Sequence, residues 1–216
     1  MKKFTICLMA LSAIIAAAAD VAICGSGYGR HEIGQIVNKV LKRKDVKFTF
    51  ENIGEFPEYA KYQKSKLLIV ASEAKRKFTA GEMTQFQQWL TAGGTALFIC
   101  RAANSLAPAK SWTWCGMTPV YRFQYDAQMP DKDNPIVKNI KFTPFKDILG
   151  VRVTPPAKVI IGSGDVALIA ESSIGKGKLY LMANEYFRMA ARKWNHPFKD
   201  EYLKIMQNIV DLSTQK

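Results

Sequence analysis

Short apolar runs alternate with amphipathic segments along the first half of the chain. Three of these runs are almost wholly apolar, at 21–24, 67–70 and 95–100. Such runs, without polar alternation, are typical of strands that are buried on both faces of a parallel sheet. Between 31 and 41, and again between 80 and 92, apolar residues recur every three or four positions, which predicts helices. The order predicts a three-layer α/β domain around a largely parallel sheet.

The second predicted helix has clear start and stop signals. Thr79 and Glu82 have the spacing of a capping box, in which each side chain accepts a hydrogen bond from a backbone amide at the helix start. Gly93 and Gly94 follow the last apolar position, and glycine readily adopts the left-handed conformation that ends helices. The buried face of this helix is expected to carry four large apolar side chains: Met83, Phe86, Trp89 and Leu90.

The second half of the chain predicts short strands more than helices. Four are expected, at 151–155, 158–162, 166–171 and 178–183, and Gly175-Lys176-Gly177 predicts a hairpin turn between the last two. Residues 112–125 form an aromatic, irregular stretch whose side chains are expected in the core, although the alternation of Tyr121, Phe123 and Tyr125 fits one face of a strand. Residues 200–212 predict a final amphipathic helix with Leu203, Met206, Ile209 and Val210 inward. No repeat or linker interrupts 20–216, so a single domain is expected.

Residues 1–19 have the composition of a secretory signal peptide. Met1-Lys2-Lys3 is a short basic segment, the run 4–19 is apolar, and Ala17-Ala18-Ala19 offers a cleavage site before Asp20. The run is shorter than the ~20 residues that cross a bilayer, so an uncleaved anchor is the less favoured alternative. We expect an exported protein, periplasmic or secreted, with no stable membrane span after cleavage.

The chain is strongly basic. Lys and Arg total 31 against 18 Asp and Glu, which gives a formal net charge of +13. No nucleic-acid-binding motif accompanies these charges, so we expect no nucleic-acid partner. The simpler interpretation is a solvated basic surface without a specific partner. The alternative is a surface that binds anionic polymers of the cell envelope. With two histidines and four cysteines, we expect no metal site and no cofactor.

A glycine-rich turn lies between the first predicted strand and the helix that follows it. Glycines let the backbone approach a ligand, and a helix N-terminus favours an anion. Arg101, after the strand 95–100, is expected at the same sheet edge. An ordinary strand-to-helix turn is the alternative, because Arg30 stands where a dinucleotide-binding motif has its last glycine. The candidate ligand-binding residues at this edge are Gly25, Ser26, Gly27, Arg30, His31 and Arg101.

Three segments carry a family resemblance. Residues 79–100 (TAGEMTQFQQWLTAGGTALFIC) are similar to a unit that consists of a helix, Gly-Gly and an apolar strand. The segment Asn134-Pro135-Ile136-Val137 is similar to a His-Pro-Ile turn. Residues 167–183 are similar to paired strands that are joined by a Gly-Lys-Gly turn. This pattern resembles the class I glutamine amidotransferase-like superfamily, flavodoxin-like proteins that include ThuA-like and related secreted bacterial groups. The resemblance implies a three-layer flavodoxin-like fold with extra short strands in the C-terminal half. Many members are not amidotransferases, so it implies little about activity.

The resemblance also implies a nucleophile. In catalytic amidotransferases of the superfamily a cysteine follows the central strand, usually continued by Arg-Gly. Cys100 and Arg101 match this pattern, whereas Ala102 replaces the glycine. A nucleophilic thiolate also needs a nearby base. The alternative is a buried, inert Cys100.

The matching base is also incomplete. His196-Pro197 is similar to the family's late His-Pro-Glu motif, but Phe198 stands where the carboxylate is expected. Glu185 or Asp200 would have to orient the imidazole instead. Cys100, His196 and Glu185 are therefore the catalytic candidates, and a surface His196 without a catalytic role is the alternative.

A disulfide would compete with catalysis in an exported protein. The mature chain holds three cysteines: Cys24, Cys100 and Cys115. In the expected strand order another strand separates Cys24 from Cys100, which is too far for a bond. Cys100–Cys115 is then the more favoured pair, and three thiols are the plainest interpretation.

The sequence therefore favours an exported protein without amidotransferase activity. It is expected to bind a small polar or anionic ligand, with carbohydrate-related ligands among the candidates, at the carboxyl edge of the sheet. Two alternatives stay open: a Cys-dependent hydrolase or amidase using Cys100 and His196, and a basic interaction module at the cell envelope.

Overall fold

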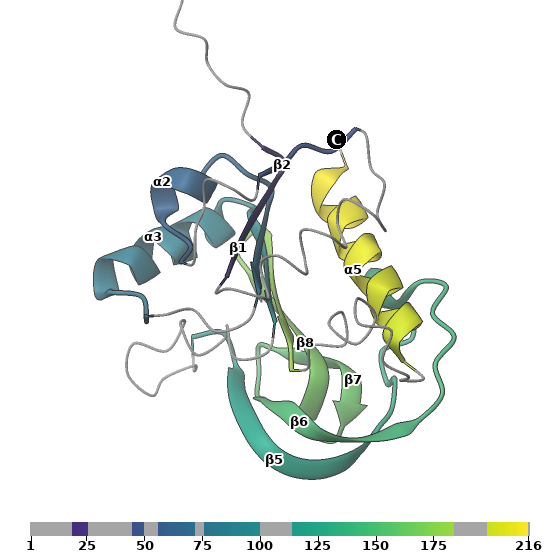
Figure 1. Ribbon diagram of the computed structural model, residues 1–216. Coiled ribbons are helices and arrows are strands. Elements are labelled where there is room, and N and C mark those ends of the chain that lie inside the picture. The colour runs from purple at the N-terminus through teal and green to yellow at the C-terminus, as the bar shows by residue number, and fades with distance from the viewer. Residues whose placement is uncertain are drawn as a thin grey trace, which may run out of the picture.

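A mixed sheet forms the centre of the molecule. The computed structural model describes residues 19–25, 45–49, 56–71, 76–99, 114–183 and 198–215. Within these ranges the sheet has nine strands, in the order β2-β1-β3-β4-β9-β8-β6-β5, with β7 paired to β8 outside this path. Helices α2 and α3 cover one face and α5 covers the other (Figure 1). The predicted three-layer flavodoxin-like α/β fold is confirmed.

One half of the sheet is parallel. It contains β2 (Phe48–Thr49), β1 (Val21–Gly25), β3 (Leu67–Ala71), β4 (Thr95–Ile99) and β9 (Gly177–Met182), and each neighbouring pair runs parallel. β1, β3 and β4 are buried along their whole length. The short apolar runs of the sequence are therefore central parallel strands, as predicted.

The other half is antiparallel and more exposed. It contains β8 (Val166–Ile174), β6 (Phe145–Val153), β5 (Met117–Ala127) and β7 (Lys158–Ser163). β8 joins β9 through a tight hairpin in which Ile174 pairs with Gly177, so the predicted Gly-Lys-Gly turn is confirmed. β5 curves around the lower end of the molecule in Figure 1.

From Met117 onward the stretch 112–125 is a strand, as the alternation of Tyr121, Phe123 and Tyr125 indicates, and is not irregular. It belongs to β5, and its partner β6 begins at Phe145, before the predicted strand 151–155. The register of the two strands shifts between Tyr121 and Tyr125, which the sequence pattern does not predict. Tyr125 is buried, as expected of a core residue.

Helix α3 (Ala80–Thr91) follows its sequence signals closely. Thr79 Oγ1 accepts a hydrogen bond from the Glu82 amide at 3.3 Å, and Glu82 Oε2 accepts one from the Thr79 amide at 2.9 Å, so the capping box is formed. The helix ends before Gly93, which has a positive φ of 115°. The buried face carries the four predicted side chains: Met83, Phe86, Trp89 and Leu90.

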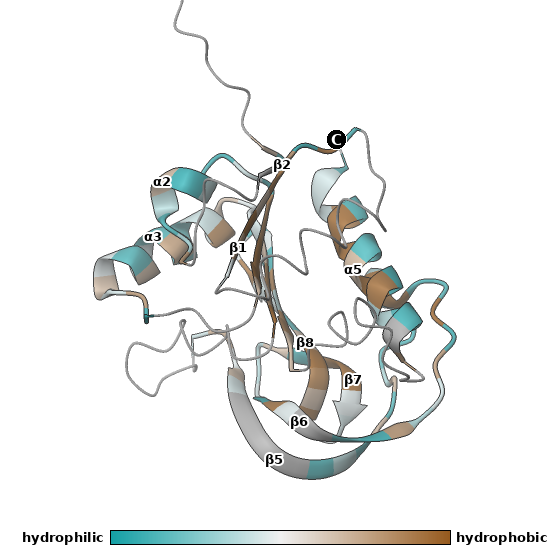
Figure 2. Cartoon of the chain, in the orientation of Figure 1, coloured by the Kyte–Doolittle hydropathy of each residue, from teal (hydrophilic) through white to brown (hydrophobic). Residues whose placement is uncertain are grey.

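Two further helices complete the layers. α2 (Tyr59–Tyr62) is the short helical turn beside α3, and α5 (Lys199–Thr214) lies on the opposite face, where its apolar positions point at the sheet (Figure 2). The buried face of α5 differs from the prediction in part, because Leu203 is only half-buried. The buried positions include Tyr202, Ile205, Met206, Ile209 and Val210. No helix in the described ranges has the length and apolar character of a membrane span.

Candidate functional site

The parallel strands end together at one edge of the sheet. Gly25 at the end of β1 is in register with Ala71 at the end of β3, and Ile99 at the end of β4 is in register with Met182 at the end of β9. We call this the carboxyl edge. Ligands of open α/β sheets gather at this kind of edge, because loops leave the strands there and carry the variable side chains.

Gly25 brings two strands into close contact at the carboxyl edge. Its φ is +150°, a conformation that residues with a side chain rarely adopt. A Cβ built on Gly25 would overlap the carbonyl oxygen of Ala71, so only glycine fits without moving the backbone. Gly25 therefore has a structural role, and its role as a ligand contact stays a prediction.

Most of the predicted site residues lie outside the described part of the chain. These are Ser26, Gly27, Arg30, His31, Cys100, Arg101, Glu185 and His196. Chain connectivity alone relates two of them to the carboxyl edge, because Ser26 directly follows β1 and Cys100 directly follows β4. The roles predicted for all eight remain predictions.

The described cysteines are structural in character. Cys24 is buried in β1, and β3 separates β1 from β4, as the expected strand order required. The Cys115 thiol donates a hydrogen bond to the Met117 carbonyl oxygen at 3.9 Å, and burial raises the pKa of this thiol to about 12. The pairing of Cys100 with Cys115 stays a prediction, because Cys100 lies outside the described residues.

An aromatic cluster fills the space between α2, α3 and the sheet. Phe86 of α3 stands at its centre. The neighbouring rings have centroids between 5.5 and 6.4 Å from that of Phe86, and they belong to Phe78, Phe98, Trp114, Trp89 and Tyr62. Phe98 lies near the end of β4, so the cluster reaches from the helices toward the carboxyl edge.

Two polar atoms are buried within this cluster without a partner. The hydroxyl of Tyr62 and the Nε1 of Trp114 have no hydrogen-bond partner among the described residues. Leaving such a group unsatisfied costs about 1–3 kcal/mol. The pKa of Tyr62 lies well above its ordinary value because of burial first, and then because of negative charge at Tyr59, Cys24 and Glu82. Tyr62 precedes the start of β3 by five residues, and its ring centroid lies 5.2 Å from that of Trp89, so its backbone belongs to the end of the molecule where β3 begins.

No local sequence signal marks these two atoms. Trp114 belongs to the aromatic stretch that is expected in the core, and no motif singles out Tyr62. An aromatic side chain with a polar atom usually has a partner for that atom when it is buried. The missing partner, which only a three-dimensional structure reveals, separates Tyr62 and Trp114 from ordinary core residues.

Metal binding finds no support in the described ranges. There, no group of three or more His, Cys, Asp or Glu side chains is arranged to hold a metal ion. The aromatic cluster offers two buried hydrogen-bond donors and several aromatic faces instead. Such groups suit a small polar ligand.

Comparison with known proteins identifies the fold. No family model matches the chain, and no curated protein matches its sequence. Among solved structures, a cytoplasmic protein from Salmonella typhimurium LT2 has a TM-score of 0.59 at 11% identity, and the match covers 90% of this chain and 99% of that one. A ThuA-like protein from Bacteroides uniformis has a TM-score of 0.55 at 13% identity, covering 95% of this chain and 96% of that one.

A glycosidase contains a similar structure within a longer chain. The exo-β-1,4-mannosidase Op5Man5 from Opitutaceae bacterium strain TAV5 has a TM-score of 0.50 at 11% identity; the match covers 93% of this chain but only 37% of that one. At such identities these likenesses establish the fold alone. The chain therefore has the class I glutamine amidotransferase-like, flavodoxin-like fold that ThuA-like proteins share.

Proposed function

We propose that this protein is an exported, non-catalytic binding domain whose ligand is small and polar or anionic. The ligand would sit at the carboxyl edge. The observation that carries the proposal is that the parallel strands finish in register at one edge, where ligands of open α/β sheets gather. The aromatic cluster on this sheet also holds the unpartnered hydroxyl of Tyr62, from which a ligand oxygen could accept a hydrogen bond.

The chemistry available at this edge suits hydroxylated ligands. The Tyr62 hydroxyl and the Trp114 Nε1–H both act as donors. Arg30 and Arg101 would supply positive charge toward an anionic group, as the sequence predicts. The likeness to part of a mannosidase makes a β-1,4-linked mannose disaccharide the first carbohydrate probe to test.

The test compares two tyrosine variants of the mature chain, residues 20–216. Calorimetric titration with β-1,4-mannobiose, and separately with malonate as an anionic probe, measures the affinity. Tyr62→Phe removes the buried hydroxyl and keeps the ring, so we expect binding to weaken about tenfold with no loss of thermal stability. Tyr59→Phe is the matched control, because Tyr59 is a partly exposed neighbour in α2, and it should bind as the wild type does.

Two results would overturn the proposal. One is that neither probe binds at millimolar concentration. The other is that Tyr62→Phe binds as tightly as the wild type while losing stability, since the hydroxyl would then have a purely structural role. Export is tested separately by N-terminal sequencing of the secreted protein, where Asp20 should be the first residue and an intact Met1 would contradict cleavage.

A Cys-dependent hydrolase is the second candidate. It is favoured by the place of Cys100 in the chain, directly after β4, which lies between β3 and β9 in the sheet. Open α/β sheets often carry a reactive residue after such a strand. Hydrolysis of p-nitrophenyl acetate and of glutamine that disappears in Cys100→Ser would favour this candidate over simple binding. Unchanged or absent hydrolysis would exclude it.

A further inference from the structure

A polar cavity lies at the edge of the sheet opposite the carboxyl edge. Its volume is about 550 Å³. Thr95, the first residue of β4, and Lys178, near the start of β9, belong to its wall, so the cavity lies at the amino ends of these parallel strands. The end of α5 contributes Ser213, and the loop before η3 (Pro135–Val137) contributes Asp133. Cavities of 300–1,000 Å³ are the usual size of small-molecule sites.

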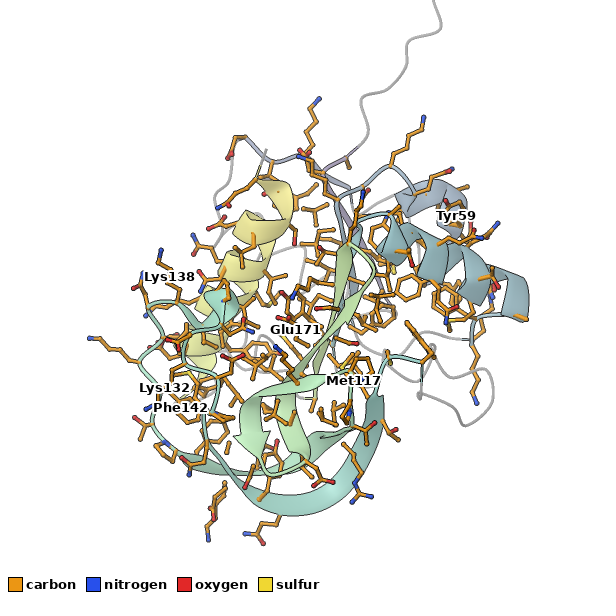
Figure 3. All side chains as sticks on the ribbon, turned by 180° about the vertical axis from the view of Figure 1, so that it is seen from behind. Tyr59, Met117, Lys132, Lys138, Phe142 and Glu171 are labelled. Atoms are coloured by element: carbon orange, nitrogen blue, oxygen red, sulfur yellow. The ribbon has the colours of Figure 1, made fainter. Side chains whose placement is uncertain are left out.

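A buried carboxylate anchors one wall of this cavity. Glu171 of β8 is only 6% exposed, and Figure 3 shows it in the middle of the molecule. One of its oxygens forms an ion pair with the Lys178 ammonium, and the other accepts a hydrogen bond from Asn134 Nδ2 at 3.2 Å. The Tyr180 hydroxyl also lies beside it, and burial, followed by the charge of Glu171, keeps the pKa of Tyr180 above its ordinary value.

Asn134 extends this network to the rim of the cavity. Its Nδ2 also donates to Asp131 Oδ2 at 3.1 Å, and its Oδ1 accepts from the Ile136 amide at 3.2 Å. The carboxylate of Asp131 is therefore held in place by the same amide that binds Glu171. A wall whose polar groups are already hydrogen-bonded to one another loses little entropy when a ligand binds.

Other charges on the wall have no such partners. Lys158, Lys176 and Asp133 all line the cavity, and in the described part of the chain none of their side chains forms an ion pair. The cavity as a whole is lined by three lysines and three acidic residues. Positive and negative groups thus line the same cavity, and Lys158, Lys176 and Asp133 form no ion pair with one another.

We infer that this cavity binds a small zwitterion, of the class of amino acids and short peptides. The ligand carboxylate would lie against Lys158 and Lys176, and its ammonium group against Asp131 and Asp133. A simple anion would also face the two aspartates, and a simple cation would also face the lysines, so each would be repelled by part of the wall. A ligand with separated charges of both signs is attracted at both ends.

This site is independent of the carboxyl edge. The strands of the parallel half begin at one edge of the sheet and end at the other, so the two sites lie at opposite ends of the strands. The zwitterion proposal can therefore fail while the proposed function holds, and the reverse is equally true.

The experiment is calorimetric titration of the mature chain with L-alanyl-L-alanine. The N-acetylated peptide and the C-terminal amide, each of which lacks one charge, are titrated in parallel. We expect the dipeptide to bind and each blocked form to bind at least tenfold more weakly. No binding at millimolar concentration, or equal binding of the blocked forms, would overturn the inference.

Variants locate the binding. Lys158→Ala and Asp133→Asn should each weaken binding of the dipeptide about fivefold to tenfold. Lys132→Ala and Asp165→Asn are matched controls, because these charged residues are not part of the cavity wall. Both controls should bind as the wild type does. Equal losses in the controls and the cavity variants would mean that net charge, and not this cavity, attracts the peptide.

Discussion

At the residue scale, Gly25 shows how tightly the carboxyl edge is constrained. Gly25→Ala should lower the free energy of unfolding by about 2 kcal/mol or more, because the backbone is strained for alanine and the Cβ would overlap the Ala71 carbonyl. Urea unfolding measures the loss. Gly81→Ala is the matched control: a Cβ there meets nothing within 4 Å, and Gly81 lies in α3, so stability should stay equal or rise slightly. Equal losses in both variants would contradict this assignment.

Cys115 gives a second prediction at the same scale. With its pKa raised to about 12 by burial, its thiol stays protonated in the native state at pH 8, and thiols react as thiolates. Iodoacetamide should therefore modify Cys115 slowly in the native protein and rapidly in 8 M urea, as read by peptide mass spectrometry. Rapid modification of the native protein would contradict the burial of this thiol.

At the element scale, the start of α3 depends on one carboxylate. The hydrogen bond from Arg76 holds the pKa of Glu82 down to about 2, helped by the amide and hydroxyl of Thr79. A lowered pKa means that the ionised carboxylate stabilises the folded state above the ordinary value of 4.5, and that this contribution is lost as the pH falls toward 2.

Glu82→Gln should therefore destabilise the protein in a pH-dependent way. We expect a loss of about 1 kcal/mol at pH 7, which is typical of a weakened helix cap, and almost no difference from wild type near pH 2. Urea unfolding at pH 7, 4 and 2.5 provides the comparison, with Asp165→Asn of an exposed ion pair as the control. A difference that stays constant over this range would show that the carboxylate charge is irrelevant to the cap.

The elements differ in how far the sequence predicts them. α3 and the strands β1, β3 and β4 could be predicted because their signals are local: a capping box, a glycine stop and continuous apolar runs. β5 could be predicted only in part: Tyr121, Phe123 and Tyr125 alternate as in a strand, but no local signal marks its start at Met117 or its register shift. The fold can be predicted from local patterns where the local propensity of a segment agrees with its packing in the structure.

The polar sites could not be predicted from local sequence patterns, for a different reason. Glu171 meets Asn134 across 37 residues of sequence, and nothing in either segment predicts that contact. The one available signal was a charged residue at the end of the otherwise apolar run 166–171. Likewise, the unpartnered state of the Tyr62 hydroxyl depends on every side chain packed around it. Contacts between distant segments depend on the order of strands in the sheet, and local sequence patterns do not specify that order.

At the scale of the whole molecule, the net charge makes a separate prediction. With a formal charge of +13, the protein should bind an anionic polymer such as heparin at low salt. Because that attraction comes from dispersed surface charges, retention should decline steadily with rising salt, since screening shortens to about 8 Å at 0.15 M. Retention that persists at 1 M salt would instead indicate a specific interaction module, the envelope-binding alternative.

The central claim is that a small polar ligand binds at the carboxyl edge. Chemical-shift mapping of the isotopically labelled mature protein, titrated with β-1,4-mannobiose and then with malonate, tests it most directly. The account predicts that one of these probes shifts the signals of Gly25, Ala71 and Ile99 most strongly, while Thr95 and Gly177 at the other edge stay unchanged. Shifts that centre on Thr95 and Gly177, or no shifts with either probe, would contradict it.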